Sequence, residues 1–313
     1  MIAARTVDGF PALTLAATAA GGIEATFVPV AGMVGCSLRH RDEELLGQRA
    51  GLRAYVAERK TMGIPLLYPW ANRLGSRRFE VAGREVVVEP EATPVALEEH
   101  GLVIHGLLAG MPGWRVERHE AADDGGVLAA SFDFAAHEAL MAAFPFAHEL
   151  RLEVTLHGAT LTVATTVLAS GDTAVPVAFG FHPYLRLPGV DRSDWEVEVP
   201  VSEQLRLDDR MLPTGERVGA SVHTGRLGSR TFDDAYPAPA DGAPFVLAGG
   251  GRRIELAFAE GYPYAQVFAP AEDDVVAYEP MTAPTNALVD DGPQLPVVAP
   301  GDQYRAVFSI AIS

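Results

Sequence analysis

The sequence predicts an all-β protein, a large antiparallel β-sandwich with few short helices. Apolar and polar residues alternate along many segments, which is typical of strands with one buried face and one exposed face. The 31 glycines and 23 prolines lie mostly between these segments, where they favour turns. Segments with the period of about 3.6 residues of an amphipathic helix are scarce. These observations together predict short strands in two packed sheets.

Four segments show the alternation most clearly. In the first of them, Glu149, Arg151 and Glu153 separate the apolar residues of one face. A strand with this pattern buries its apolar face and leaves the charged face in water. We therefore expect half-buried strands whose buried positions are Leu150, Leu152, Val154 and Leu156; Trp195, Val197, Val199 and Val201; Ile254, Leu256 and Phe258; and Tyr304, Phe308, Ile310 and Ile312.

Glycine clusters mark two expected hairpin turns, and one stretch has helical character. The clusters at residues 125–126 and 249–251 have strand patterns on both sides. Residues 135–143 predict two helical turns that end before Pro145. No linker, composition shift or fixed-period repeat divides the chain, so we expect one domain over residues 1–313.

The charge of the chain excludes some partners. Its formal charge is −17, from 41 acidic and 24 basic residues. This excess disfavours nucleic acid and anionic membrane surfaces, and we expect neither as a partner. No apolar stretch has the length of a membrane span. The uncharged run 9–23 follows only one basic residue, Arg5, which is too few for a signal peptide. We expect a cytoplasmic location.

Several chemistries lack their sequence signatures. The chain has no glycine-rich phosphate loop, no GxGxxG, no GxSxG and no HExxH. Its single cysteine, Cys36, excludes an internal disulfide and is expected to be a buried, inert thiol. Nucleotide and serine-hydrolase chemistry are therefore disfavoured, and no cofactor is expected.

Four other segments differ from plain strand patterns. In each, a histidine or another polar residue interrupts or ends an apolar run, and in three of them aromatic residues lie beside it. They are residues 68–73 (Tyr-Pro-Trp-Ala-Asn-Arg), 104–106 (Ile-His-Gly), 179–184 (Phe-Gly-Phe-His-Pro-Tyr) and 275–281 (Val-Val-Ala-Tyr-Glu-Pro-Met).

Each of these residues also has a structural interpretation. His182 can be a hydrogen-bonded core residue, and Arg73 can be half of an ion pair. Glu279, at the end of an apolar strand and before a proline, can simply face solvent. Taken together, the segments supply two imidazoles, a carboxylate and a guanidinium. This set suits a small polar ligand that is bound by acid–base groups.

A metal site competes for the same residues. His105, His182, Glu279 and the neighbours Asp233 and Asp234 include side chains that bind zinc or iron. No local spacing such as HxH or CxxC supports that interpretation, so we expect no metal.

In the order of its motifs, the chain resembles the aldose 1-epimerase (galactose mutarotase-like) family, whose fold is a large antiparallel β-sandwich. The resemblance runs nearly end to end, and the Glu-Pro-Met segment is its most specific part. The motifs are residues 28–32, 43–47, 72–73, 104–106, 144–146, 182–184, 232–236, 279–286 and 300–301.

The resemblance implies roles for the matching residues. Glu279 would be the general base that removes the proton of the anomeric hydroxyl, and His182 would be the general acid that protonates the ring oxygen. Implied sugar-binding residues are Asn72, Arg73, His105 and one of the two adjacent aspartates, of which Asp233 fits better because an aromatic residue, Tyr236, follows three positions later.

Aromatic residues of the same segments complete the expected site. Trp70, Phe181 and Tyr184 each have either a place in the core or a role as a packing surface for the apolar face of a sugar, and of the three we expect Tyr184 to be substrate-binding. The implied partner is a small sugar, without a cofactor, and the implied assembly is a monomer or a weak homodimer.

The chemistry of mutarotation requires such groups independently. Opening a cyclic hemiacetal needs one proton removed from O1 and one given to O5, so we expect a base and an acid that face each other across the ring. A carboxylate and an imidazolium can supply both if their environments hold complementary protonation states. No redox group and no nucleophile is needed.

Departures from the family leave the sugar open. A leucine follows Gly106, where the common family form has a second glycine. One alternative is a hexose-6-phosphate 1-epimerase, in which Arg77 and Arg78 would reach the phosphate, although both can equally be solvated turn residues. Another alternative is a sugar-binding protein that kept the fold without turnover.

Overall fold

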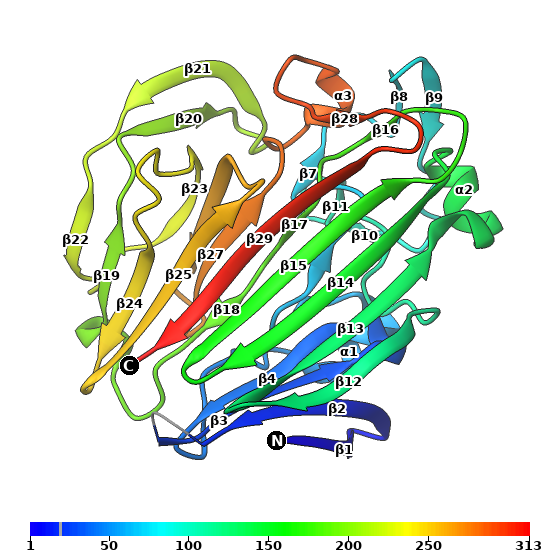
Figure 1. Cartoon of the computed structure of the whole chain (residues 1–313). Helices are drawn as coiled ribbons and strands as arrows, with labels where there is room; N and C mark the ends of the chain where they lie inside the picture. The colour runs from blue at the N-terminus through cyan, green and yellow to red at the C-terminus, as the bar shows by residue number, and fades with distance from the viewer. Residues whose placement is uncertain (19–20) are drawn as a thin grey trace.

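The computed structural model describes residues 1–18 and 21–313. A nine-stranded antiparallel sheet crosses the molecule, and β14, β15 and β29 lie side by side at its centre (Figure 1). Leu150, Leu152, Val154 and Leu156 are buried, as their alternation predicts. The sheet order is β12 (Arg115–Ala122), β13 (Gly125–Asp133), β14 (His148–His157), β15 (Thr160–Ala169), β29 (Gln303–Ile312), β25 (Arg252–Glu260), β24 (Phe245–Gly249), β19 (Glu196–Val199) and β22 (His223–Arg226).

An eight-stranded sheet packs against the nine-stranded one. The ring of Phe181 lies 5.0 Å from that of Phe308, and the ring of Tyr278 lies 5.1 Å from that of Phe245, so aromatic side chains join the two sheets. The strands in order are β21 (Pro213–Gly219), β20 (Glu203–Leu207), β23 (Phe232–Pro237), β26 (Tyr264–Ala269), β27 (Val276–Met281), β17 (Gly180–Phe181) and β6 (Leu66–Leu67), with β18 (Tyr184–Leu185) also paired with β27.

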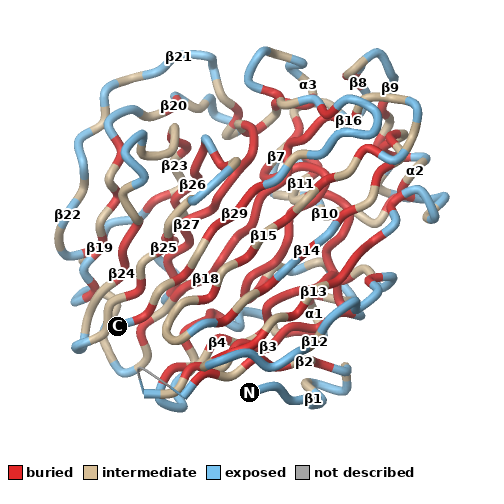
Figure 2. The backbone as a smooth tube through the Cα atoms, viewed as in Figure 1, coloured by how far each residue is buried: buried red, intermediate tan, exposed pale blue. Residues whose placement is uncertain are grey.

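Smaller sheets surround these two layers. The N-terminal sheet packs its second strand against β13 and β14, and Cys36 of its fourth strand is buried, as expected. The central strands are buried, whereas β1 and β21 are mostly exposed (Figure 2). These sheets contain β1 (Ile2–Val7), β2 (Phe10–Ala17), β3 (Ile23–Val28), β4 (Val34–His40) and β5 (Glu43–Glu44); β10 (Ala96–Leu97), β11 (Val103–Ile104) and β7 (Arg73–Leu74); β16 (Val175–Pro176) and β28 (Val297–Val298); and β8 (Arg78–Val81) and β9 (Arg84–Val87).

The all-β antiparallel prediction is confirmed, with local corrections. Residues 135–143 do not form one helix, because Asp133 caps a 3-10 turn (Phe134–Ala136) before α2 (Glu138–Ala143) begins. Residues 125–126 begin β13 instead of forming a turn; a Cβ on Gly125 would lie 1.8 Å from the carbonyl oxygen of Leu156. The turn at Gly250 and Gly251 is as predicted. The pattern missed α1 (Gly51–Glu58) and α3 (Ala287–Asp290).

Candidate active site

Strand register brings His182 opposite Glu279. Gly180 of β17 pairs with Met281, and Tyr184 of β18 pairs with Ala277, so the residue midway between the two short strands faces Glu279 of β27. The Nε2 atom of His182 lies 3.1 Å from Oε1 of Glu279. The side-chain alternation of a strand explains the direction of the pair, because Tyr278 and Phe181 point into the core between the sheets. Their neighbours Glu279 and His182 point away from it.

Glu279 lies inside β27 and not at a strand end facing solvent, as one interpretation of the sequence had it. It is 2% exposed, and pairing with β26 continues through Pro280 to Met281. A proline removes one backbone donor from the ladder without ending the pairing.

Burial weakens the charged form of both side chains. Burial raises the pKa of Glu279 well above its usual value, and the charge of Asp233 raises it further. Burial lowers the pKa of His182 well below its usual value, and His105 and Arg49 lower it further. Within the described residues, His182 Nδ1 and Glu279 Oε2 have no hydrogen-bond partner. The pair is therefore poised to share one proton, with acceptor capacity left for a ligand.

The two groups of the pair are closer together than a base and an acid on opposite sides of a sugar ring, which is the arrangement that the sequence predicts. The two groups lie side by side, at 3.1 Å. This arrangement suits the chemistry, because O1 and O5 of a cyclic aldose are both bonded to C1 and one contact between the two groups can serve both oxygens.

Two residues with left-handed backbone bring the remaining imidazole to the pair. Asn72 and His105 have φ values of 57° and 62°, and the His105 amide donates to the Asn72 carbonyl at 2.9 Å. The ring of His105 lies edge-on to that of His182, with 5.7 Å between centroids. Burial lowers the pKa of His105 to about 3, aided by Arg73 and Arg49, so this imidazole is neutral at physiological pH.

Gly106 lets the backbone next to His105 pack closely against Tyr68, and replacement of this glycine tests that packing. A Cβ at Gly106 would lie 2.1 Å from the Tyr68 carbonyl oxygen, whereas one at Gly101 meets nothing within 4 Å. The φ values are +71° and +72°, so alanine brings similar backbone strain at both, about 1–2 kcal/mol. We expect Gly106→Ala to lower the free energy of unfolding in urea by at least ~2 kcal/mol more than Gly101→Ala. Equal losses would contradict this packing.

Arg73 connects three polar side chains beside the cleft. Its guanidinium donates to Asn72 Oδ1 at 2.9 Å and to Glu98 Oε2 at 3.3 Å, and it lies 3.9 Å from Asp233 Oδ2. Asp233 also accepts from Gln266 Nε2 at 2.6 Å. Asp234 instead accepts from Gln204, so Asp233 is the aspartate next to Arg73.

The aromatic residues are less accessible than expected. Tyr184 is 1% exposed, and its ring stacks on that of His182 with 4.0 Å between centroids. Trp70 and Phe181 are buried too, and Phe181 belongs to the contact between the sheets. Trp70 and Phe181 therefore belong to the core and do not offer a packing surface to a sugar. A sugar contact by Tyr184 stays a prediction.

Gln266 and Arg49 were missed from the sequence. Gln266 of β26 pairs with Glu279, is 1% exposed, and its Oε1 has no partner among the described residues. Its signal was a single amide inside the apolar run 264–269. Arg49 lies in a loop without a recognisable pattern, yet it donates to Tyr184 at 3.0 Å.

A cleft of about 1040 Å³ adjoins the pair. His105 and Thr61 line it, and these residues contact His182 and Tyr184 respectively. The two guanidinium groups that would reach a phosphate in the alternative function lie elsewhere, because Arg77 and Arg78 are exposed at the start of β8 and do not line this cleft.

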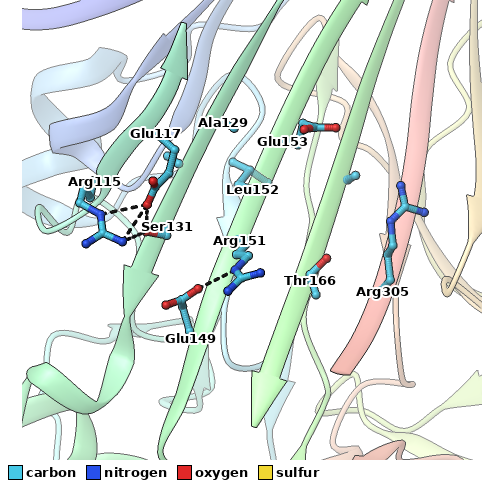
Figure 3. A pocket seen from close by; sticks show the side chains of 12 residues that line it. Arg115, Glu117, Ala129, Ser131, Glu149, Arg151, Leu152, Glu153, Thr166 and Arg305 are labelled. Atoms are coloured by element: carbon cyan, nitrogen blue, oxygen red, sulfur yellow. Dashed lines mark hydrogen bonds and ion pairs between the residues drawn. The ribbon is translucent and has the colours of Figure 1, made fainter. Parts of the chain in front are cut away.

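A second hollow, of about 520 Å³, lies on the solvent face of the nine-stranded sheet (Figure 3). Arg115 pairs with Glu117 at 2.8 Å, and Arg151 pairs with Glu149 at 2.6 Å. Exposed charges paired along strands are typical of a solvated sheet face. This hollow lacks the acid–base groups, so the cleft at His105 is the candidate active site.

In the part of the chain that the structure describes, no group of three or more His, Cys, Asp or Glu residues is arranged to hold a metal ion. Among the same residues, no helix has the length and apolar character needed to cross a membrane.

The chain is similar to known epimerases in sequence pattern and in structure. The family model for aldose 1-epimerase matches residues 21–311. A galactose mutarotase-like protein from Clostridium acetobutylicum matches with a TM-score of 0.86 and 17% identity, over 100% of this chain and 98% of its own. No curated protein sequence matches.

Two other solved structures have the same fold. Galactose 1-epimerase from Lactobacillus acidophilus NCFM has a TM-score of 0.76 and 13% identity, over 100% of this chain and 98% of its own. An aldose epimerase homologue from C. elegans has a TM-score of 0.74 and 17% identity, over 96% of this chain and 98% of its own.

Proposed function

We propose that this protein, which belongs to the aldose 1-epimerase family, interconverts the α and β anomers of a free aldose. In this proposal Glu279 is the general base and His182 is the general acid. The observation that carries it is the direct contact of these two buried side chains, at 3.1 Å, next to a cleft large enough for a sugar.

One proton on the pair is sufficient for the reaction. When the O1 hydroxyl of the sugar donates to the unpartnered oxygen of Glu279, it stabilises the carboxylate form, and the shared proton moves to His182. Glu279 then takes the O1 proton as C1 and O1 form a carbonyl. The C1–O5 bond breaks, and O5 takes the proton of His182.

The open-chain aldehyde completes the cycle by rotating about the C1–C2 bond. O5 attacks the other face of C1, returns its proton to His182, and O1 takes the proton from Glu279. The pair ends with the same single proton with which it began. Neither a cofactor nor exchange with solvent is needed within a turnover.

The surrounding side chains suit the binding of sugar hydroxyls. His105 is neutral, so one of its ring nitrogens can donate and the other accept. Arg73 offers charged donors, and Asp233 and Gln266 offer an acceptor oxygen each. Asn72 holds the Arg73 guanidinium in place. We propose Asn72, Arg73, His105, Asp233 and Gln266 as the residues that orient the sugar.

The shared proton makes the activity depend on pH in a bell-shaped manner. Burial lowers the pKa of His182, so the second proton joins the pair only at pH well below 6.5 and stops activity there by neutralising the base. Burial raises the pKa of Glu279, so the pair keeps its one proton to a pH well above 4.5 and loses activity beyond. We expect kcat/KM to show a plateau between these two limbs. A rate without an acid limb would contradict the shared proton.

Anomer exchange by NMR tests the proposal on glucose, galactose, arabinose, xylose and glucose 6-phosphate. We expect the protein to increase the exchange rate of at least one free aldose above the uncatalysed rate. Tight binding of a sugar with exchange at the uncatalysed rate would support a non-catalytic sugar-binding protein instead.

A phosphorylated aldose is the second candidate substrate, and one observation favours it. Arg59 lines the cleft, and its buried Nε atom has no hydrogen-bond partner among the described residues. Two other cations of the cleft, Arg49 and Lys60, are each paired with an acidic side chain. A higher kcat/KM for glucose 6-phosphate than for glucose would establish this substrate.

A further inference from the structure

The imidazole of His182 lacks the contact that usually fixes a functional histidine. Such a ring is commonly oriented by a hydrogen bond from the nitrogen that does not react. In His182 the reacting atom is Nε2, next to Glu279, while the buried Nδ1 has no partner within residues 1–18 and 21–313. Apart from the Nε2 contact, packing has to orient this ring.

Tyr184 provides that packing. Its ring lies 4.0 Å from the His182 ring, at an interplanar angle of 17°, so the two rings are stacked. The rings of His105 and Phe268 contact His182 at steeper angles of 84° and 74° and limit it on other sides. A stacked neighbour fixes the plane of the imidazole only if the neighbour is itself fixed.

Arg49 and Thr61 fix Tyr184 through its hydroxyl. Arg49 donates to this hydroxyl at 3.0 Å, and Thr61 Oγ1 lies 2.6 Å from it. A guanidinium can only donate, so the tyrosine hydroxyl accepts from Arg49 and is free to donate to Thr61. The Arg49 guanidinium also lies 4.8 Å from the Tyr184 ring centroid and pairs with Asp273 at 3.0 Å.

We propose that Arg49 and Thr61, acting through Tyr184, are positioning residues that hold the His182 imidazole toward Glu279. We name Arg49, Thr61 and Tyr184 the tyrosine clamp. The effect of the clamp on anomer exchange rests on the proposed function, whereas its effect on the His182 ring does not.

The clamp also sets the charge around His182. The titratable and charged groups that face this ring are Glu279 from β27, His105 after β11, Tyr184 from β18 and Arg49 before α1. Of these, Arg49 carries a permanent positive charge, which lowers the pKa of His182. Removal of that charge while the fold is kept should therefore raise the pKa of His182.

NMR of the histidine ring nitrogens tests the clamp without any sugar. In Tyr184→Phe, which keeps the stacked ring but loses the hydroxyl, we expect the His182 signals to shift and broaden. In Arg49→Gln we expect the pKa of His182 to rise, and Arg49→Lys should restore part of the wild-type value. Arg53→Gln removes an exposed cation of α1 and serves as the control.

Kinetics provide the second measurement. Misplacement of a reacting group by about 1 Å costs on the order of 10²-fold in rate, so we expect Tyr184→Phe and Thr61→Val to lower kcat by about 10- to 100-fold with a much smaller change in KM. Unchanged His182 signals and pKa in both Tyr184→Phe and Arg49→Gln would overturn the clamp. Wild-type protein without anomer exchange would overturn the proposed function, and the ring NMR would still decide the clamp.

Discussion

Glu279→Gln is expected to lower the rate of catalysed anomer exchange by about 10²- to 10⁴-fold, the usual contribution of one positioned general base. Glutamine has nearly the shape of glutamate and keeps an oxygen toward the cleft, but it cannot take the proton from O1. The loss should appear in kcat, because the base acts in the transition state and not in sugar binding. Exchange NMR over a range of sugar concentrations separates the two parameters.

The same variant is expected to be at least as stable as the wild type above neutral pH. Burial raises the pKa of Glu279 in the folded state, so ionisation of this group opposes folding as pH rises above the unfolded value of 4.5. Glutamine removes that ionisation. We expect a thermal midpoint at pH 8 that is not lower than the wild-type value. Glu272→Gln, an exposed carboxylate just before β27, is the matched control for charge. A variant that unfolds at pH 8 would show Glu279 to be structural.

His182→Gln is expected to produce a loss of similar size, about 10²- to 10⁴-fold, because O5 would then leave without a proton. Glutamine can still donate a hydrogen bond to Glu279, so the contact of the two side chains is kept while the exchangeable proton is lost. The alkaline limb of the pH profile, which reports loss of the shared proton, should also disappear from the residual activity, whereas the acid limb should remain because Glu279 must still be ionised to act as the base.

An exposed histidine provides the control for this variant. His100→Gln changes a side chain at the surface, near Glu99, and should leave both the rate and the pH profile as in the wild type. Full activity of His182→Gln would assign the proton of O5 to another group.

The strands with one solvated face were predictable from the sequence, and those buried on both faces were not. In β14 buried and more exposed residues alternate, so its period of two is visible. In β27 all six residues are buried, because one face meets the nine-stranded sheet and the other forms the site. Glu279 therefore resembled a strand end. Helix α1 was not predicted because only Leu52 and Tyr55 of its eight residues are buried, which is too few to produce a helical pattern of apolar residues.

Two histidines show why the site needed the fold. Both His148 and His182 lie among apolar and aromatic residues in the sequence. His148 is a core residue with both ring nitrogens bonded, to Tyr68 at 2.6 Å and to the Phe146 carbonyl at 2.7 Å. In His182, Nδ1 has no hydrogen-bond partner among the described residues, and Nε2 contacts the carboxylate of Glu279. Only the pairing of β17 and β18 with β27 distinguishes them, and this register is a long-range property.

Motif order, in contrast, identified the family before any contact was known. Residues 72–73, 105, 182 and 279 are far apart along the chain, and the structure brings them into one neighbourhood through β7, β11, β17 and β27. Gln266 and Arg49 were not predicted because neither belongs to those motifs. Each is recognisable only by its contacts with Asp233 and Tyr184 respectively.

A double-mutant cycle in anomer exchange tests the central claim most directly. The claim is that Glu279 and His182 act as one unit through a shared proton. The rates of wild type, Glu279→Gln, His182→Gln and the double variant are measured by exchange NMR on the best free aldose of the panel. We predict a fast wild type and a double variant about as slow as either single variant, because two groups that act as a unit are not additive. A wild type no faster than uncatalysed exchange, or single losses that multiply in the double variant, would contradict the account.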